Sequence, residues 1–241
     1  MPRVSVNILT KNRAELLKKA LASVLMQSFK DFQIVVVDDG STDNTEATLQ
    51  NLKIENLKIV SHRQSSGITK SRQEALEKSE GEYIAILDDD DEWLDKDKLK
   101  KQLDYFEQHP KAVLVGGGIK TKNEDFKLKS QSDIQIRQTM LFRNNFYTST
   151  IMFKKSAAMQ AGGFIIDGAD LAEDYDLWLR LGNLGEMANL NELFAAYRVS
   201  DYNKLRYKEF LKKQLALVKR EKNNYNGAWL AALILNIRLL G

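Results

Sequence analysis

Short apolar runs alternate with longer segments of helical period over the first 110 residues. Apolar runs predict strands, and apolar residues that recur every three or four positions predict helices. The expected strands are residues 4–9, 32–37, 57–60 and 83–87. The expected helices are residues 12–28, 41–52, 68–78 and 95–107. Ser41 or Thr42 is the expected cap of the second helix. Repeated strand–helix units predict an α/β fold in which helices flank a mostly parallel central sheet.

The pattern changes after residue 110, and the second half is expected to be mixed rather than parallel. Residues 112–121 predict two extended pieces around a bend at Gly116–Gly118, with a bulge or a hairpin as the plainer interpretation. The other expected strands are residues 149–153 and 193–199. The expected helices are residues 134–142, 156–161 and 172–181. We therefore divide residues 1–200 into a first half, 1–110, and a second half, 111–200.

Residues 201–241 are expected to form a separate helical tail. Tyr207, Leu211, Leu215 and Val218 mark one helix face, and most lysines lie elsewhere around that helix. Residues 228–240 are almost wholly apolar, but a bilayer needs about 20 such residues to be crossed. Core packing, a partner interface and shallow docking on a membrane remain open for the tail.

Composition narrows the class of protein. The 241 residues are 43% hydrophobic and 29% charged, which excludes disorder, and 2 Pro residues leave no Pro-rich linker, so one main domain is expected. With no Cys and 2 His, a disulfide, a thiolate metal site and a histidine-built zinc centre are excluded. Metal chemistry must therefore use carboxylates. The chain begins directly with a strand pattern and not with a secretion signal, so a cytoplasmic location is expected.

Charge is unevenly distributed along the chain. The net charge is +3, which gives no reason to expect a nucleic-acid partner. Residues 201–241 carry nine basic and three acidic side chains, a net +6, which leaves −3 on residues 1–200. An acidic body suits a metal or a polar substrate, and a basic tail suits an anionic surface.

Two acidic clusters follow predicted strands directly. Asp38 and Asp39 end the second strand, and the four aspartates of residues 88–91 end the fourth. The carboxyl ends of parallel strands meet at one edge of a sheet, where ligands of α/β proteins bind. The two clusters therefore predict one polar site at this edge.

The run of four aspartates suggests a divalent cation. Adjacent like charges repel, and Mg²⁺ or Mn²⁺ offsets that cost because these ions prefer oxygen ligands and complete their shell with water and phosphate. In an extended segment Asp88 and Asp90 project to the same side, so one can meet a nucleotide ribose and the other a metal on its diphosphate. The alternative is a solvated acidic turn at the start of the next helix.

Several motifs occur in an order that points to one family. They are VSVNILTKNR at 4–13, QSF at 27–29, IVVVDDGSTD at 34–43, GITKSR at 67–72, GEYIAILDDDDEW at 81–93, GGF at 162–164, EDYDLWLRL at 173–181 and YRV at 197–199. Over about residues 2–200, this order resembles the family 2 glycosyltransferases of GT-A fold, whose Rossmann-like sheet binds a nucleotide-sugar donor. The combination is specific, although each motif alone is modest.

The resemblance implies a set of site residues. Those at the donor nucleotide are Thr10, Lys11, Asn12, Arg13, Asp39, Arg72, Asp88 and Asp89. Asp88 and Asp90 match the outer members of the DxD motif, for ribose and metal, and the metal is Mn²⁺ or Mg²⁺. Asp174 matches the catalytic base, and Glu173 is expected to orient the site or the acceptor. Taken alone, Glu173 and Asp174 are better explained as acids in the first turn of a helix.

The implied activity is that of a metal-dependent, inverting glycosyltransferase. The donor is expected to be a UDP-sugar, and the acceptor a hydroxyl of a glycan or of a lipid-linked molecule in bacterial cell-surface polysaccharide biosynthesis. The enzyme is expected in the cytoplasm or at the cytoplasmic face of the membrane, with peripheral membrane contact through the tail. The second half, 111–200, is expected to be the acceptor and catalytic half.

Two positions depart from the family pattern, and alternative functions stay open. Lys11 stands where an aromatic residue is common, and Ser200 stands where a histidine is common. A sugar nucleotidyltransferase is disfavoured because residues 10–13 contain no glycine. A non-catalytic nucleotide- or glycan-binding module predicts the loss of one acidic cluster, but the clusters are all present. Trp178 is expected in the core, Trp93 is placed near the donor, and His62 and His109 are expected in loops or at the surface without a catalytic role.

Overall fold

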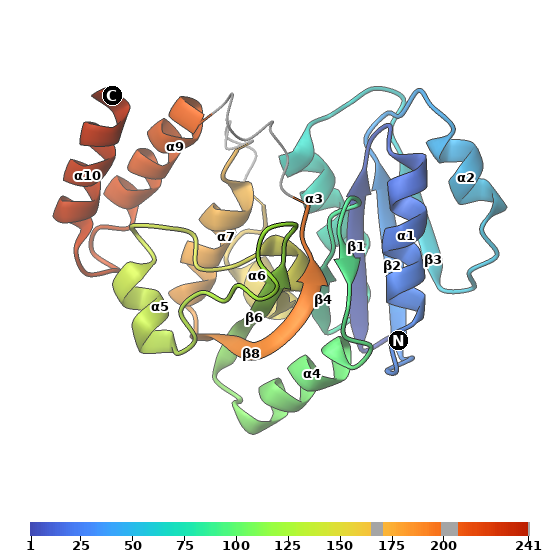
Figure 1. The fold of residues 1–241 in the computed structure, drawn as a ribbon, viewed down its shortest axis with the longest axis horizontal. Coiled ribbons are helices and arrows are strands. Elements are labelled where there is room, and N and C mark those ends of the chain that lie inside the picture. The colour runs from blue at the N-terminus through green and yellow to red at the C-terminus, as the bar shows by residue number, and fades with distance from the viewer. Residues whose placement is uncertain (165–170, 199–206, 241) are drawn as a thin grey trace.

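The computed structural model describes residues 1–164, 171–198 and 207–240. Its strands are β1 Val4–Thr10, β2 Phe32–Asp38, β3 Leu57–Ser61, β4 Tyr83–Ile86, β5 Glu92–Trp93, β6 Ala112–Lys120, β7 Met152–Lys154 and β8 Glu186–Ala196. In this part of the chain eight strands form one sheet, in the order β3-β2-β1-β4-β7-β6-β8-β5. The predicted α/β class with a mixed second half is confirmed (Figure 1).

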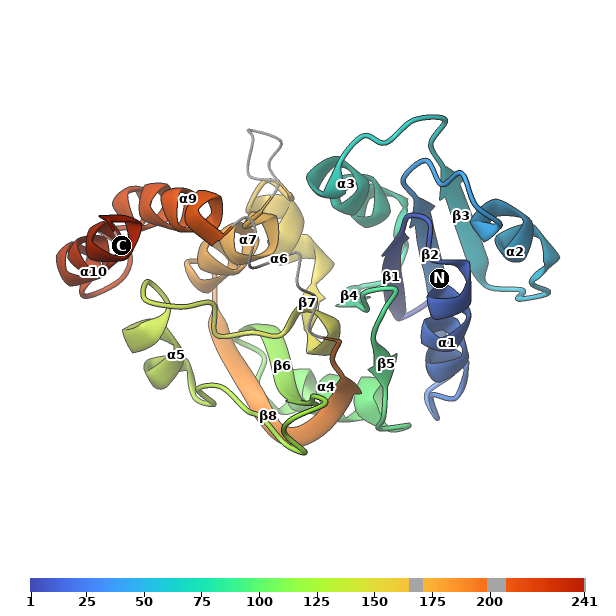
Figure 2. The same ribbon diagram turned by 45° about the horizontal axis from the view of Figure 1, so that its top comes forward.

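The helices lie on both sides of this sheet (Figures 1 and 2). They are α1 Ala14–Leu25, α2 Thr45–Asn51, α3 Ile68–Lys78, α4 Lys98–Gln108, α5 Asp133–Thr139, α6 Lys155–Gln160, α7 Glu173–Gly182, α9 Tyr207–Arg220 and α10 Ala228–Leu240, with a 3-10 turn η1 at Thr148–Thr150. Each helix expected from apolar periodicity is present within a few residues of its expected bounds. Apolar spacing therefore located the helices well, whereas the last strand, expected at 193–199, is β8 and begins at Glu186.

The first half is a parallel sheet buried on both faces. β2 pairs in parallel with β1 and β3, and β1 pairs in parallel with β4. All seven residues of β2 are buried, as a near-continuous apolar strand in such a sheet requires. Leu17 and Leu21 of α1 share a core cluster with β1, whereas Ala75 of α3 packs with Val35 and Val37 on the opposite face. This half presents the carboxyl ends of β1, β2 and β4 at one edge.

β7 joins the two halves. It pairs antiparallel with β4 on one side and with β6 on the other, and β6 pairs in parallel with β8. Phe153 of β7 packs against Trp178 of α7, whose ring is fully buried in the core of the second half. The expectation that Trp178 is a core residue is confirmed.

The glycine run does not divide its segment into two pieces. Residues 112–120 form the single strand β6, and the register against β8 shifts at Gly116–Gly118, which agrees with the bulge and not with a bend or hairpin. The reason is steric, because a Cβ atom on Gly117 would lie 2.3 Å from the ring of Phe194 in β8. The glycines let β8 approach closely.

The predicted cap of α2 is wrong. The residue that precedes the helix is Asn44, and neither Ser41 nor Thr42 caps it. The Ser41 hydroxyl instead donates to Oδ1 of Asp38, 2.5 Å away, so it closes the turn that follows β2. Local hydrogen bonding to an aspartate competes successfully with helix capping here.

The tail packs against the second half through one face only. Leu211 and Val218 of α9 and Leu235 of α10 belong to the same core cluster as α7. On the outer face of α10, Trp229 is 74% exposed and Ile237 is 61% exposed. α9 and α10 lie side by side at the end of the molecule far from β3 (Figures 1 and 2). Among the described helices, none is long and apolar enough to span a membrane.

Candidate active site

A cavity of about 830 Å³ opens at the carboxyl edge of β1, β2 and β4 and reaches the start of α7. The residues of the expected site that line it are Thr10, Lys11, Arg13, Asp39, Arg72, Asp88, Asp89, Asp90, Glu173 and Asp174. They come from five separate segments of the chain. The fold therefore brings the two acidic clusters and the first turn of α7 around one space.

Asn12 is not among the residues that line the cavity, but it stabilises two loops beside it. Its φ of 55° puts the backbone in the left-handed region, which asparagine tolerates better than most residues. Its side-chain oxygen accepts from the Thr42 backbone N–H at 2.7 Å, and its own N–H donates to Ser41 Oγ at 2.8 Å. Asn12 thus ties the loop after β1 to the turn after β2.

The four aspartates form a turn, and the extended segment expected from the sequence is wrong. The Asp91 N–H donates to the carbonyl of Asp88 at 3.1 Å. Arg13 spans the turn, with Nη1 at 2.7 Å from Oδ1 of Asp89 and 3.1 Å from Oδ2 of Asp90. Burial raises the pKa of Asp89 and of Asp90, although the charge of Arg13 opposes both shifts. Arg13 offsets part of the repulsion within the turn.

Asp91 points inward and anchors the turn. Its carboxylate accepts from the Ser149 hydroxyl and from the Arg198 backbone N–H, the latter at 2.7 Å. Burial, followed by the charge of Asp88, raises the pKa of Asp91. The sequence analysis placed Trp93 near the donor. In the structure Trp93 is a core residue, because it is 5% exposed and its Nε1–H donates to the Ser149 carbonyl.

Arg72 connects the two halves of the site. Its Nη2 lies 3.1 Å from Oδ1 of Asp88, and its Nε lies 3.1 Å from Oε1 of Glu173. Burial alone would lower the pKa of Arg72, but the charges of Asp88 and Glu173 outweigh it and raise the value. Burial and the charge of Asp174 raise the pKa of Glu173 against the opposing effect of Arg72. Arg72 and Glu173 therefore form a buried ion pair.

Asp174 is oriented by a residue that the sequence did not single out. The Thr148 hydroxyl donates to Oδ2 of Asp174 at 2.6 Å. Lys129 holds the segment before Thr148, because its Nζ donates to the carbonyls of Asn144 and Phe146, each at 2.8 Å. Burial lowers the pKa of Lys129 to about 8. No local motif marks Thr148 or Lys129, because both act through contacts distant in the sequence.

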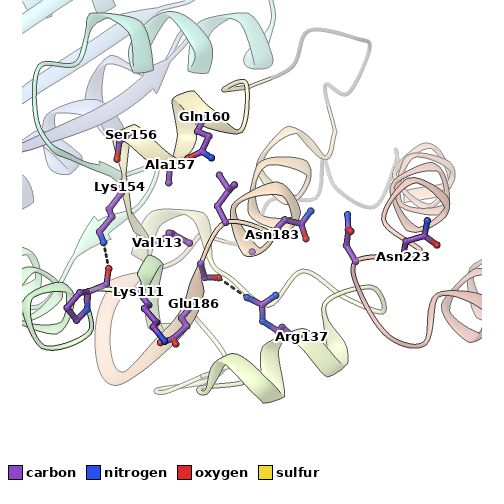
Figure 3. Close-up of a pocket in the computed structure, with 15 residues that line it drawn as sticks. Lys111, Val113, Arg137, Lys154, Ser156, Ala157, Gln160, Asn183, Glu186 and Asn223 are labelled. Carbon is purple, nitrogen blue, oxygen red and sulfur yellow. Dashed lines mark hydrogen bonds between the residues drawn. The ribbon is translucent and has the colours of Figure 1, made fainter.

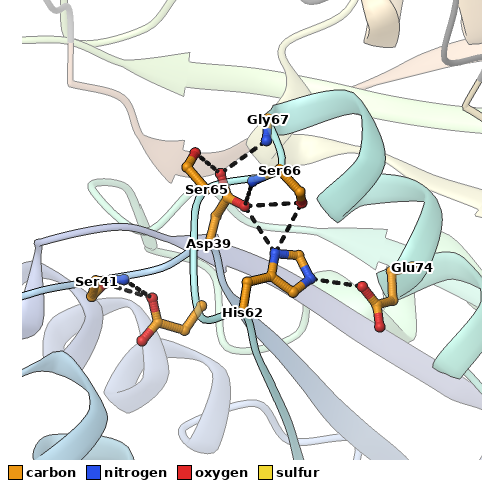
Figure 4. Close-up of polar contacts among 8 residues, drawn as sticks. Asp39, Ser41, His62, Ser65, Ser66, Gly67 and Glu74 are labelled. Atoms are coloured by element: carbon orange, nitrogen blue, oxygen red, sulfur yellow. Dashed lines mark hydrogen bonds and ion pairs between the residues drawn. The ribbon is translucent and has the colours of Figure 1, made fainter.

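Asp39, which also lines the cavity, is at the centre of a polar network formed with Ser65, Ser66, Gly67 and His62 (Figure 4). Its carboxylate accepts from the Ser66 N–H at 2.7 Å and from the Ser65 hydroxyl at 2.5 Å. His62 lies in a loop, as expected, but its ring is 13% exposed and bridges Asp39 and Glu74. Burial would raise the pKa of Asp39, but hydrogen bonds from Ser65, His62 and Ser66 lower it well below its ordinary value.

Tyr197 and Arg198 line the cavity near the aspartate turn. Burial, followed by the charges of Asp88 and Asp91, raises the pKa of Tyr197. Ser200, the position of the second departure from the family pattern, lies outside the described residues.

The charge of the cavity suits a cation. Its described lining includes seven carboxylates, at positions 39, 88–91, 173 and 174, against the four cations Lys11, Arg13, Arg72 and Arg198. Within residues 1–164, 171–198 and 207–240, no three His, Asp or Glu side chains form a group that could hold a metal by itself. An ion at this site would therefore need ligands from water or substrate, which is how Mg²⁺ usually binds.

A second cavity, of about 850 Å³, lies between the ends of α6 and α7 and the start of β6 (Figure 3). Two of the cationic side chains that line it are already hydrogen-bonded to backbone carbonyls of the protein. Lys154 Nζ donates to the Pro110 carbonyl at 2.6 Å, and Arg137 Nη2 donates to the Gly185 carbonyl at 2.7 Å. The candidate chemistry therefore lies in the acidic cavity.

Comparison with known proteins agrees with this geometry. Residues 5–166 match the family model described as Glycosyl transferase family 2. The teichuronic acid biosynthesis glycosyltransferase TuaG of Bacillus subtilis is 31% identical over 206 residues, which are 82% of this chain and 79% of the relative. The UDP-Glc:alpha-D-GlcNAc-diphosphoundecaprenol beta-1,3-glucosyltransferase WfaP of Escherichia coli is 29% identical over 203 residues, 83% of this chain and 78% of the relative.

Among solved structures, the mannosyltransferase PcManGT of Pyrobaculum calidifontis, in complex with GDP-Man and Mn²⁺, has the same fold. The TM-score is 0.76 at 20% sequence identity, and the match covers 99% of this chain and 70% of that protein.

Proposed function

The chain belongs to glycosyl transferase family 2 and has the GT-A fold, and from that premise we propose that it transfers a sugar, with inversion, from a nucleotide-diphosphate donor to an acceptor hydroxyl. The proposed donor is a UDP-sugar. Support for this choice comes from the E. coli relative, whose name gives UDP-Glc as its donor. Because the chain is a glycosyltransferase, neither a sugar nucleotidyltransferase nor a non-catalytic binding module is needed to explain the site.

The observation that carries the proposal is the position of Asp174. It lines the same cavity as the aspartate turn, and Thr148 fixes its Oδ2. A carboxylate held there can take the proton of an acceptor hydroxyl as that oxygen attacks the anomeric carbon from the side opposite the diphosphate. We therefore assign the role of general base to Asp174.

Next to Asp174, Glu173 forms an ion pair with Arg72. Arg72 binds Glu173 and Asp88 at the same time, so its guanidinium carries positive charge toward the donor side of the cavity. Charge that develops on the leaving diphosphate would be stabilised there, and such fixed electrostatic stabilisation is among the largest contributions to catalysis. We assign the positioning of the site to Glu173 and nucleotide contact to Arg72.

The acidic cavity fits a divalent cation. Its donors are all oxygens, and carboxylates outnumber cations in the lining. Asp88 and Asp90 would hold Mn²⁺ or Mg²⁺, which when bound would stabilise the leaving diphosphate. Arg13 pairs with Asp89 and Asp90 and keeps the turn compact. The remaining proposed nucleotide residues line or brace the cavity: Thr10, Lys11, Asn12 and Asp39.

We place the acceptor at a membrane. The name of the E. coli relative gives a diphosphoundecaprenol-linked sugar as its acceptor, and the B. subtilis relative is named for teichuronic acid biosynthesis. A lipid-linked acceptor in polysaccharide biosynthesis explains the outer face of α10, where Trp229, Leu233 and Ile237 are exposed one turn apart. On α9, Lys208, Lys212 and Lys219 are exposed and would favour anionic lipids.

A bilayer suits this face better than a second copy of the chain. A stable dimer uses about 20–30 residues on each side, far more than one helix face supplies. A bilayer needs only a few buried apolar side chains, each worth about 1.5–3 kcal/mol, together with basic residues nearby. We therefore propose an anionic membrane surface as the partner of α10.

The proposal is tested by separating transfer from binding. Asp174→Asn should lower transfer by about 10²- to 10⁴-fold, the usual contribution of a general base, while nucleotide affinity stays within about twofold. Asp90→Asn should instead weaken Mn²⁺-dependent nucleotide binding. Thermal shifts with UDP, GDP, dTDP and CDP, with and without Mn²⁺, identify the donor base, and turnover is then measured with that donor and a membrane extract.

Asp125→Asn is the matched control, because Asp125 is an exposed acid paired only with Lys120 in the described structure. It should leave binding and turnover unchanged. Full turnover by Asp174→Asn would overturn the assignment of the base, and unchanged Mn²⁺ dependence in Asp90→Asn would overturn the metal site.

A further inference from the structure

The acidic cavity has an aromatic section that its charged residues do not explain. Tyr197, Tyr207 and Phe210 line the cavity together with Leu171. Tyr207 and Phe210 belong to α9, in the tail, which the sequence analysis placed outside the acceptor half of residues 111–200. The tail therefore forms part of the wall of the active-site cavity.

The two aromatic residues of α9 are held by a well-packed helix. Tyr207 and Phe210 are three positions apart, so their side chains lie on one face of α9. Phe210 is partly buried and packs against the core of the second half, where Leu211 and Val218 of the same helix are buried. Tyr207 is 47% exposed. The core therefore fixes the helix and leaves Tyr207 accessible to a ligand.

The position of α9 relative to the proposed base defines which substrate it can meet. α7, whose first turn carries Asp174, lies between α9 and the strands β1 and β2 in both ribbon views (Figures 1 and 2). The proposed donor occupies the carboxyl edge of β1, β2 and β4, and the acceptor oxygen must attack the anomeric carbon from the side opposite the diphosphate. The acceptor therefore reaches Asp174 from the side of α9, where Tyr207 and Phe210 line the cavity.

The composition of this section suits a sugar ring. A pyranose has apolar C–H faces and a rim of hydroxyls, and ligand pockets combine aromatic side chains with a few polar groups that fix orientation. Polar residues of the second half that line the cavity include Thr148 and Asn144. Asn144 Oδ1 accepts from the Phe146 N–H at 3.0 Å, and among the described residues its side-chain N–H₂ has no partner. This amide can therefore donate to a sugar hydroxyl.

Charge distinguishes the sugar of a lipid-linked acceptor from its diphosphate. The four cations in the described lining of the cavity, Lys11, Arg13, Arg72 and Arg198, all come from segments other than α9. A diphosphate needs cations or N–H donors, whereas the C–H face of a sugar needs an apolar surface. The α9 wall therefore suits the sugar.

We propose that Tyr207 and Phe210 form the subsite for the terminal sugar of the acceptor, with the Tyr207 ring stacked on that sugar. This inference rests on the proposed function and extends the acceptor site beyond residue 200. α9 also lies beside α10, whose outer face is the proposed membrane surface (Figures 1 and 2). The tail would thus hold the acceptor sugar and contact the membrane that carries it. Loss of either ring weakens the acceptor and not the donor.

The experiment titrates lipid-linked saccharides, extracted from bacterial membranes and dispersed in detergent, at fixed donor and Mn²⁺. Detergent removes the bilayer, so docking of α10 on a membrane does not contribute. Tyr207→Ala and Phe210→Ala should each raise the apparent KM for the extract by about tenfold, as expected when one aromatic side chain no longer covers the ligand. kcat should fall by less than KM rises, because the contact already exists in the ground state.

Donor binding and two further variants separate this subsite from a structural role. The dissociation constant of the donor nucleotide with Mn²⁺, measured by calorimetry, should stay within about twofold of wild type in both alanine variants. Tyr207→Phe keeps the ring and should retain most of the acceptor affinity. Phe126→Ala is the matched control, because Phe126 is also 47% exposed and is not among the residues that line the cavity. It should match the wild type in KM.

Tyr207→Ala decides the outcome if Phe210→Ala does not fold, because Tyr207 is exposed and its loss removes little packing. Thermal unfolding without ligand shows which variants remain folded. An unchanged KM in Tyr207→Ala, or a loss of donor affinity as large as the rise in KM, would overturn the inference and leave the proposed function intact. Failure of the wild type to transfer sugar to the extract would instead overturn the proposed function, and this inference with it.

Discussion

The side chain of Lys98, in α4, is fully buried. Its Nζ donates to Oε1 of Gln102 at 2.7 Å and lies 4.1 Å from the centre of the Trp93 ring. Burial lowers the pKa of Lys98 well below its ordinary value, so the folded state favours the neutral amine. The unfolded chain binds the proton up to a pH of about 10.4. Stability should therefore rise with pH between the lowered pKa and that value.

We predict that the free energy of unfolding of the wild type increases relative to Lys98→Met as pH rises from 7 to 10. Urea unfolding at several pH values measures the difference between the two proteins. Lys100→Met, an exposed position in the same helix, should show no such trend against wild type. A constant difference for Lys98→Met would mean that the ammonium stays charged inside the fold.

The residues of the site were predictable where a motif carries them. Asp39 follows a strand, Arg72 lies within a helix and Asp174 lies in the first turn of another, all elements that apolar periodicity locates, and the cavity is lined by all three. Thr148 was not predictable, because its role depends on a hydrogen bond to Asp174, 26 positions away. The partners of His62 were not predictable for the same reason, since Asp39 and Glu74 meet only after β2, β3 and α3 have packed together.

At the scale of elements, apolar spacing predicted helices and buried strands but not strand pairing. β5 has two residues, too few for any periodicity, and exists because Glu92 and Trp93 pair with the end of β8. β6 illustrates the same limit. Its three consecutive glycines suggest a bend locally, whereas the close approach of Phe194 from β8 keeps the strand continuous.

We predict that Gly117→Ala destabilises the protein by about 1–3 kcal/mol, the usual cost of overpacking a core. The new Cβ would lie 2.3 Å from the Phe194 ring, which is fully buried and has little room to move. Gly118→Ala is the neighbouring control, because its Cβ meets mainly the ring of Phe126, which is 47% exposed and can move outward. Thermal unfolding compares them, and equal losses would contradict the steric argument.

At the scale of the whole molecule, the C-terminal helix α10 has one face buried in the protein core and another face exposed to solvent. Ala231 and Leu235 bury the inner face of α10, and Trp229, Leu233 and Ile237 expose its outer face. The sequence left core packing and membrane docking as alternatives for this segment. The inner face packs in the core, and the proposed membrane contact concerns the outer face alone.

We predict that Trp229→Ser combined with Leu233→Ser reduces cosedimentation with vesicles that contain anionic phosphatidylglycerol by at least about tenfold, because two exposed apolar side chains no longer enter the interface. Met26→Ser removes another exposed apolar side chain, at the end of α1, and should bind like wild type. Raised salt should weaken wild-type binding through the lysines of α9. Equal binding by all three proteins would exclude α10 as the contact.

The guanidinium of Arg72 touches one carboxylate from each half of the molecule, Asp88 and Glu173. Replacing Arg72 therefore leaves both Asp88 and Glu173 without their ion-pair partner. A genetic screen will therefore score position 72 as impaired in donor retention and in turnover together. Changes at Asp88 and at Glu173 should separate into two distinct phenotypes, which makes that pair the better place to dissect the enzyme.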